Sequence, residues 1–158
     1  MADGSSGAAT RPTVSHVLGE VCWLMSQSGY HKHFSLGDLE WLVMPAILLE
    51  QLRVFRSEQG PPLGVAFWAY MSPEVEGRFR DQVDSGAGAR LRPDDWKSGD
   101  RLWLVEIIAP QASNGNNLMD VMVNDLATNV FPGKAFKFHM ADRATGQRVV
   151  KEMNSQLS

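Results

Sequence analysis

The chain has few of the features that mark secreted, membrane-spanning or nucleic-acid-binding proteins. Its 158 residues include one cysteine, Cys22, so no internal disulfide can form and the fold must be stable under reducing conditions. The strongest apolar run, Trp41 to Leu49, contains Pro45 and is far shorter than the roughly 18 apolar residues of a membrane span. The formal net charge is −3, so the chain lacks the excess of basic residues with which nucleic-acid-binding proteins neutralise phosphates. We therefore expect a cytoplasmic protein with no transmembrane segment and no nucleic-acid partner.

The chain also lacks the short motifs of common site chemistries. It has no serine nucleophile elbow, no Cys/His spacing typical of a metal site and no P-loop. We expect no metal and no bound cofactor. The apolar content of 44% is enough to bury a core, which indicates one domain over residues 13–158. Residues 1–12 are rich in small and polar residues and lack a signal-peptide core, so we expect them to form a flexible tail.

Hydrophobic periodicity predicts helices in the first third of the domain. Apolar residues recur at helical spacing from Val14 to Met25, and the polar residues 26–29 end this helix. Residues 30–33, Tyr-His-Lys-His, should then lie on a loop where their side chains can face a cleft. A capping sequence at residues 35–38 and the proline at position 45 predict two short helices after it.

The rest of the chain alternates strands and helices. Residues 52–57 and 63–71 flank a Gly/Pro turn and predict an antiparallel hairpin, and Ser72-Pro73 begins a helix that ends near Val83. Residues 102–108 are nearly all apolar and predict a central strand that is covered on both faces. A helix from Leu118 and two closing strands, at residues 134–140 and 148–153, follow. The sum is an α+β fold, or an α/β sandwich, with a mixed, mostly antiparallel sheet flanked by helices.

Two polar features stand out against this apolar background. One is the pair His31 and His33 after the first helix, and the other is Glu106 within the central strand. An ionisable group in such a strand costs several kcal/mol unless it is paired or reaches a cleft. The alternatives are a structural or exposed loop histidine and a glutamate at the strand end that faces solvent.

Four ordered blocks resemble the RTX toxin-activating lysine acyltransferases, over residues 17–138. Leu18 to Leu24 followed by Ser28-Gly29-Tyr30-His31 is similar to the opening of that family. The run Asp95 to Trp103, continuing through Glu106 to Pro110, is similar to the family's signature, and the segments 45–47 and 66–69 lie in the expected order between the two. The resemblance implies a GNAT-like acyltransferase fold.

The resemblance also implies the chemistry. The donor would be the phosphopantetheine thioester of acyl carrier protein, used as a co-substrate, and the acceptor would be internal lysine ε-amines of an RTX protoxin. The family's catalytic histidine falls on His31, and its acidic residue, usually Asp, falls on Glu106, which is one methylene longer. The chain also has Gly29 in place of a proline, and residues 111–113 replace an aromatic and a glycine.

The residue types at positions 31 and 106 suit acyl transfer to a lysine. A free lysine has a pKa of about 10.4, so forming its neutral amine at pH 7 costs roughly 4.6 kcal/mol, and histidine suits the role of the base. Glu106 could fix the imidazole tautomer, or could itself receive the lysine proton through water. Direct attack of His31 on the thioester ranks below direct transfer, because nothing marks a two-step site.

Further residues are candidates for substrate binding. The basic cluster of Arg90, Arg92, Lys97 and Arg101 either lies in a solvated loop of mixed charge or docks the acidic carrier protein. The helix start with Asn114 and Asn116 either is an ordinary terminus or holds the donor phosphate. Trp68 and Trp103 are core residues by default and candidates for an acyl groove.

Two other functions remain open. One is a GNAT-like N-acetyltransferase that uses acetyl-coenzyme A, although residues 111–115 lack its glycine-rich pyrophosphate loop. The other is a binding relative that has lost catalysis, for which the glutamate at position 106 is the argument. Acyl length, target protein and oligomeric state are left open, a homodimer among the alternatives.

Overall fold

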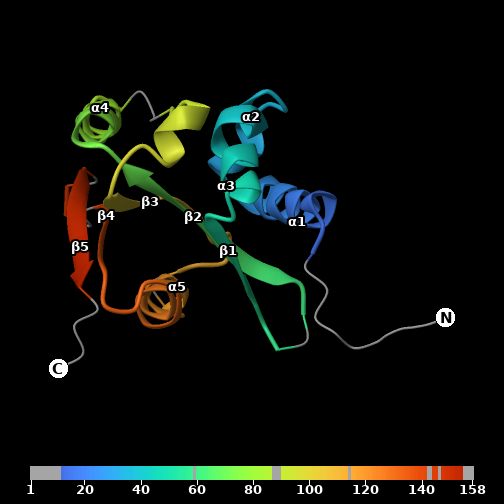
Figure 1. Ribbon diagram of the computed structural model, residues 1–158. Helices are drawn as coiled ribbons and strands as arrows, with labels where there is room; N and C mark the ends of the chain where they lie inside the picture. The colour runs from blue at the N-terminus through green and yellow to red at the C-terminus, as the bar shows by residue number, and fades with distance from the viewer. Residues whose placement is uncertain are drawn as a thin grey trace.

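A mixed sheet lies at the centre of the molecule (Figure 1). The computed structural model describes residues 12–58, 60–86, 90–113, 115–141, 144–145 and 147–154. Within these ranges the sheet has five strands in the order β1-β2-β3-β4-β5. Their bounds are β1 Leu52–Arg56, β2 Pro62–Met71, β3 Arg101–Ile108, β4 Ala135–Ala141 and β5 Arg148–Asn154. Neighbouring strands are antiparallel except β3 and β4, which are parallel and pair at one position, Trp103 with Lys137. The predicted α+β class and the central place of β3 are confirmed.

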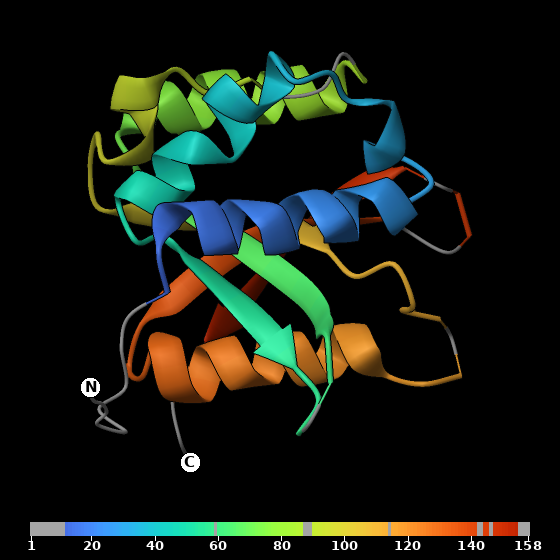
Figure 2. The same cartoon turned by 90° about the vertical axis from the view of Figure 1, so that its right-hand side faces the viewer.

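Helices cover both faces of this sheet. The helices α1 Val14–Gln27, α2 Asp38–Leu42, α3 Met44–Leu48 and α4 Pro73–Asp84 pack on one face, and α5 Leu118–Asp125 lies on the other (Figures 1 and 2). The last of these continues into a π-helical turn, Leu126–Val130. The predicted helices are confirmed, including the two short pieces around Pro45. None of the helices in the described ranges is both long and apolar enough to cross a membrane.

The hydrophobic core has two layers because strand side chains alternate between the faces of the sheet. On the side of α1 to α4, Phe67 and Trp103 pack with helix residues such as Leu24. On the side of α5, Trp68 and Leu104 pack with residues that follow α5. Strand β3 is therefore covered on both faces, as the apolar sequence of residues 102–108 predicts.

One irregularity interrupts the alternation in β3. Phe67 pairs with Glu106 and the next residue, Trp68, pairs with Leu104, so Val105 is an extra residue in the ladder. A β-bulge of this kind puts two successive side chains on the same side of the strand. Val105 packs with the α1 to α4 layer, and Glu106 opposite Phe67 points to the same layer. Without the bulge, strict alternation would turn Glu106 toward α5.

Residues 98 and 99, in the block that is similar to the family's signature, connect β2 to the start of β3 by hydrogen bonds. The backbone N–H groups of Ser98 and Gly99 both donate to the Tyr70 carbonyl, at 2.8 and 3.1 Å. The Ser98 hydroxyl accepts a hydrogen bond from the backbone of Ser72 at 3.0 Å. A Cβ on Gly99 would lie 2.5 Å from the carbonyl oxygen of Met71, so no larger residue fits there without a backbone shift. This segment is architectural, and it sets where β3 begins.

Candidate active site

The histidine at position 31 is held by the turn that follows α1. The helix ends at Gln27, and Ser28 caps it in an extended conformation. The chain then forms a single 3-10 turn, His31–His33, which the backbone N–H of Phe34 closes by donating to the His31 carbonyl at 3.0 Å. The expected loop is thus a short helical turn. It buries His31, which is 6% exposed, and leaves His33 at the surface.

Each nitrogen of the His31 ring faces a polar partner. Nδ1 lies 2.7 Å from the Ser28 hydroxyl, and Nε2 lies 3.2 Å from Oε2 of Glu106. The Ser28 oxygen accepts the backbone N–H of His31 at 3.3 Å, which leaves its own proton to donate to Nδ1. This network favours the tautomer with its proton on Nε2, facing the carboxylate. The carboxylate lies at ion-pair distance from Nε2, which has no hydrogen-bond partner among the residues that the structure describes.

Aromatic rings enclose the imidazole. Tyr30 meets the His31 ring edge-on with centroids 5.0 Å apart, and Phe34 lies at 5.3 Å. These two rings also contact each other, at 5.4 Å. The ring of His31 therefore has little freedom to rotate.

The partner carboxylate reaches the histidine because of the bulge in β3. The side chain of Glu106 is 24% exposed, against 7% for that of His31, so the pair lies between the core and the surface. Its second oxygen, Oε1, accepts the backbone N–H of Ile107 at 3.3 Å. A histidine after the first helix and an acid 75 positions later thus meet on the α1 to α4 side of the sheet.

A second carboxylate, Glu76 on α4, is more deeply buried. It is 5% exposed and accepts hydrogen bonds from Trp103 Nε1 at 2.7 Å and from Arg101 at 2.5 Å. The ammonium of Lys137 lies 3.6 Å away. Burial alone would raise the pKa of Glu76, but the hydrogen bonds from Trp103 and Arg101 and the charges of Lys137 and Arg101 lower it on balance. Glu76 fastens α4 to β3 and β4.

The residues of the predicted basic cluster have different surroundings in the structure. Arg101 is engaged by Glu76, and Arg90 lies beside Asp38 and Trp41 near the turn of His31. Arg92 and Lys97 are exposed, and they flank the 3-10 turn Pro93–Trp96 on either side. A role in docking for Arg92, Lys97 and Arg101 stays a prediction.

Three of the other predicted binding residues have structural contacts of their own. Trp68 packs against Phe131 in the α5 layer, on the opposite face of the sheet. Trp103 is fully buried beneath α4. The Asn116 side chain accepts the backbone N–H groups of Ser113 and Leu118, each at 3.1 Å, so it orders the start of α5. Asn114 lies outside the described residues, and binding roles for all four remain predictions.

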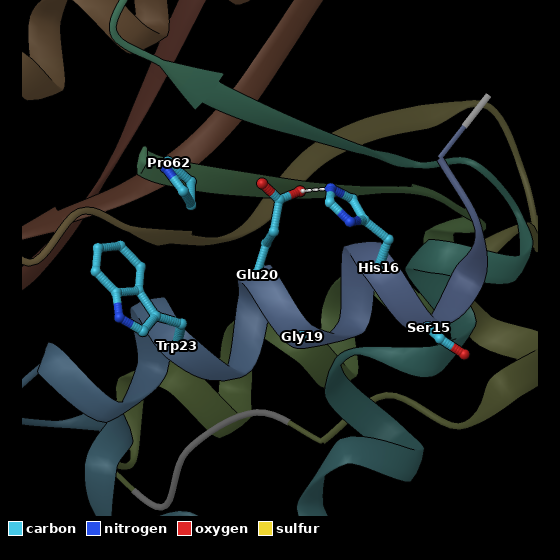
Figure 3. Close-up of a pocket in the computed structure, with 6 residues that line it drawn as sticks. All are labelled: Ser15, His16, Gly19, Glu20, Trp23 and Pro62. Atoms are coloured by element: carbon cyan, nitrogen blue, oxygen red, sulfur yellow. Dashed lines mark ion pairs between the residues drawn. The ribbon is translucent and has the colours of Figure 1, made fainter. Parts of the chain in front are cut away.

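One surface hollow lies along α1, and another lies beside the turn that follows it. One, of about 360 Å³, lies along α1 and the start of β2; Figure 3 shows Glu20 there, paired with His16 at 3.5 Å. Arg56 also pairs with this carboxylate, so its charge is satisfied. Among the described residues, none of those predicted for the site lines this hollow. The other hollow, of about 410 Å³, lies beside the turn that carries His31.

Ser28 is a contact of the candidate site that reasoning from the sequence missed. It was a landmark for locating the histidine, and the structure makes it the partner of Nδ1. Its signal was the spacing, because a serine three residues before a histidine at a helix end can reach that side chain. Within the described ranges, no group of three or more His, Cys, Asp or Glu side chains could hold a metal ion.

An imidazole held between a hydroxyl and a carboxylate is the arrangement of a general-base centre for acyl transfer. Comparison with known proteins agrees with that class: residues 10–154 match the RTX toxin acyltransferase family, and the chain belongs to it. Membership makes it a protein-lysine acyltransferase.

Named relatives cover most of the chain. It is 35% identical over 150 residues to the RTX-I toxin-activating lysine-acyltransferase ApxIC of Actinobacillus pleuropneumoniae, covering 89% of this chain and 80% of that protein. It is 29% identical over 154 residues to the protein-lysine myristoyltransferase HlyC of Escherichia coli, covering 89% and 86%. The lysine-acyltransferase RtxC of Vibrio cholerae is 32% identical over 124 residues, covering 77% and 73%.

Proposed function

We propose that this protein transfers a fatty acyl group from the thioester of acyl carrier protein to lysine ε-amines of an RTX toxin, and so activates it. The observation that carries the proposal is the buried His31, with Glu106 at 3.2 Å from one nitrogen and Ser28 at 2.7 Å from the other. The acceptor follows from the relatives, which are named as toxin-activating lysine acyltransferases. The free thiol of Cys22 supports a cytoplasmic location.

In this proposal His31 is the base and Glu106 its acidic partner. The lysine nitrogen attacks the thioester carbonyl carbon, a C–N bond forms, and the C–S bond breaks. The lysine ammonium first releases one proton to water. The second proton, which the amine loses on acylation, passes to Nδ1, either directly or through the Ser28 hydroxyl, and the departing thiolate takes it up. The carboxylate at Nε2 stabilises the imidazolium that exists between these two transfers.

The longer acid in place of the family's aspartate is compatible with this role. The carboxylate of Glu106 already lies at ion-pair distance from Nε2, so the extra methylene does not separate the pair. This weighs against the binding relative without catalysis. We also propose a GNAT-like fold, supported by the strand–helix–strand unit β3-α5-β4 with its parallel pairing.

Acyl-transfer assays with two donors test the proposal. The purified protein is incubated with an RTX protoxin and either palmitoyl acyl carrier protein or palmitoyl-coenzyme A, and acylated lysines are mapped by mass spectrometry. We expect transfer from the carrier-protein donor, and a loss of at least a thousandfold in kcat for His31→Gln. His16→Gln, an exposed histidine on α1, is the matched control and should keep full activity.

Two results would contradict the proposal. Transfer that is equal from both donors would remove the carrier protein as the specific donor. Undiminished transfer by a folded His31→Gln variant would remove the histidine as the base. An acyl-enzyme trapped by rapid quench and absent in His31→Gln would replace direct transfer with a two-step route.

A further inference from the structure

The larger hollow lies against the same turn that carries His31. Its volume is about 410 Å³, and three aromatic side chains, Tyr30, Phe34 and Trp41, line it together with Gly29, His33, Asp38 and Arg90. Tyr30 is 59% exposed, so this wall of the hollow is open to solvent. Aromatic walls with one carboxylate are the surroundings that favour a cationic side chain with an aliphatic stem.

A cation of the protein itself already occupies this position. The guanidinium carbon of Arg90 lies 5.3 Å from the centroid of the Trp41 ring, and its Nη2 lies 3.6 Å from Oδ1 of Asp38. The Arg90 side chain is 71% exposed. Ion pairs and cation–π contacts at such exposure are weak, so a competing cation can displace the guanidinium at little cost.

The receiving groups are more firmly fixed than Arg90. Asp38 accepts hydrogen bonds from Trp41 Nε1 at 2.9 Å and from the backbone N–H of Ser35 at 2.8 Å. The hydrogen bond from Trp41, followed by that from Ser35, lowers the pKa of Asp38, so the carboxylate stays charged at neutral pH. The same contact fixes the indole plane. Carboxylate and ring therefore form a preorganised site, while the arginine is only its present occupant.

The hollow and the catalytic histidine share a wall. Tyr30 and Phe34 line the hollow and also contact the His31 ring, at 5.0 and 5.3 Å between centroids. We propose that this hollow is the site where a protonated lysine side chain of the acceptor protein is recognised, and that Arg90 fills its cation position until the acceptor arrives. This inference rests on the proposed function, because it takes a lysine-bearing protein as the acceptor.

A role for Arg90 in binding an anion would predict the opposite effect of its removal. If Arg90 served to bind an anion, such as a phosphate of the donor, then its removal would weaken binding. If Arg90 competes with an incoming lysine, then its removal tightens binding of a lysine probe. The sign of the effect of Arg90→Ala separates the two.

Binding of a small probe, without donor or turnover, tests the inference. The probe is Nα-acetyl-lysine methylamide, and the norleucine analogue is its uncharged counterpart. Binding is followed by NMR at the indole N–H signal of Trp41, which is assigned with Trp41→Phe. We expect saturable shifts with the lysine probe and none with the norleucine probe. Arg90→Ala should tighten binding about two- to fivefold, which is the size of an exposed cation–π contact.

Removal of the carboxylate should act in the other direction. Asp38→Asn should weaken binding of the lysine probe at least threefold. Glu40→Gln, on the same helix, and Arg80→Ala, on α4, remove matching exposed charges outside the hollow and should leave binding unchanged. Dispersion of the other indole signals shows that each variant is folded.

Three results would overturn the inference: weaker binding in Arg90→Ala, unchanged binding in a folded Asp38→Asn, or equal binding of both probes. The test stays separate from the proposed function. If acyl transfer fails while the lysine probe binds as described, then the proposed reaction is wrong and the recognition site stands. If transfer succeeds and the probe does not bind, then only this inference falls.

Discussion

Replacing Glu106 with glutamine removes the charge beside His31 and keeps the size of the side chain. At the observed 3.2 Å, a carboxylate and an imidazolium attract each other by about 5 kcal/mol at an effective dielectric constant of about 20. The side chain of Glu106 is 24% exposed, so solvent screens the pair and about half of this value is a reasonable expectation. At about 1.4 kcal/mol for each factor of ten, kcat should fall about a hundredfold.

The shorter acid gives a graded comparison. Glu106→Asp withdraws the carboxylate by about one C–C bond, about 1.5 Å, which opens the direct contact while it keeps the charge. We expect a fall in kcat of about tenfold, between the values for wild type and glutamine. The acceptor KM should change little in either variant, because the acid acts on the proton transfer rather than on binding.

Single-turnover transfer with saturating acyl donor measures both variants, and circular dichroism confirms their folding. Glu152→Gln, which removes an exposed acid from β5, is the matched control and should retain wild-type kcat. A glutamine variant that keeps more than half of the wild-type kcat would refute the role of the carboxylate. A rise in the acceptor KM with kcat unchanged would move Glu106 from the proton transfer to substrate binding.

Three further predictions concern stability, measured by urea or thermal unfolding. Glu76→Gln should cost about 1.5–3 kcal/mol at pH 7. Because the folded-state pKa of Glu76 is lowered from 4.5, the two proteins should converge as the pH falls below that value, and equal midpoints at pH 7 would contradict the role of this carboxylate. Burial lowers the pKa of His139 from 6.5, so the unfolded chain binds the proton first and the free energy of unfolding should fall as the pH drops below 6.5. His139→Phe should make this dependence of stability on pH less steep. The same dependence in both proteins would contradict the role of His139. Gly99→Ala should cost about 1–3 kcal/mol through the clash with the Met71 carbonyl, whereas Gly77→Ala, with open space around it on α4, should be neutral or stabilising; equal effects of the two would refute the clash.

Local patterns in the sequence predicted the elements of the fold well. The periodicity from Val14 to Met25 gave α1, and the proline at position 45 gave the division between α2 and α3. Each of these signals acts within a few residues. The 3-10 turn at residues 31–33 was expected as a loop because three residues are too few to show periodicity.

The site depended on contacts between distant segments. His31 and Glu106 were paired through the family resemblance, since spacing alone says nothing of two groups on different elements. The bulge at Val105 was not predictable, because residues 102–108 are apolar on both faces and carry no alternation to interrupt. The place of Arg90 was missed for a similar reason: its neighbours Asp38 and Trp41 lie some fifty residues earlier.

The extra residue in β3 makes the active site sensitive to packing on the far side of the sheet. Leu104 and Ile107 bracket the bulge and both pack into the α5 layer, so they hold the distorted backbone from behind while Val105 and Glu106 project forward. A change in the volume of a side chain that packs against Leu104 or Ile107 would shift the backbone of residues 104–107 and move the Glu106 carboxylate with it. In the proposed mechanism, substitutions in the α5 layer would therefore change the rate of acyl transfer although none of them touches the His31–Glu106 pair.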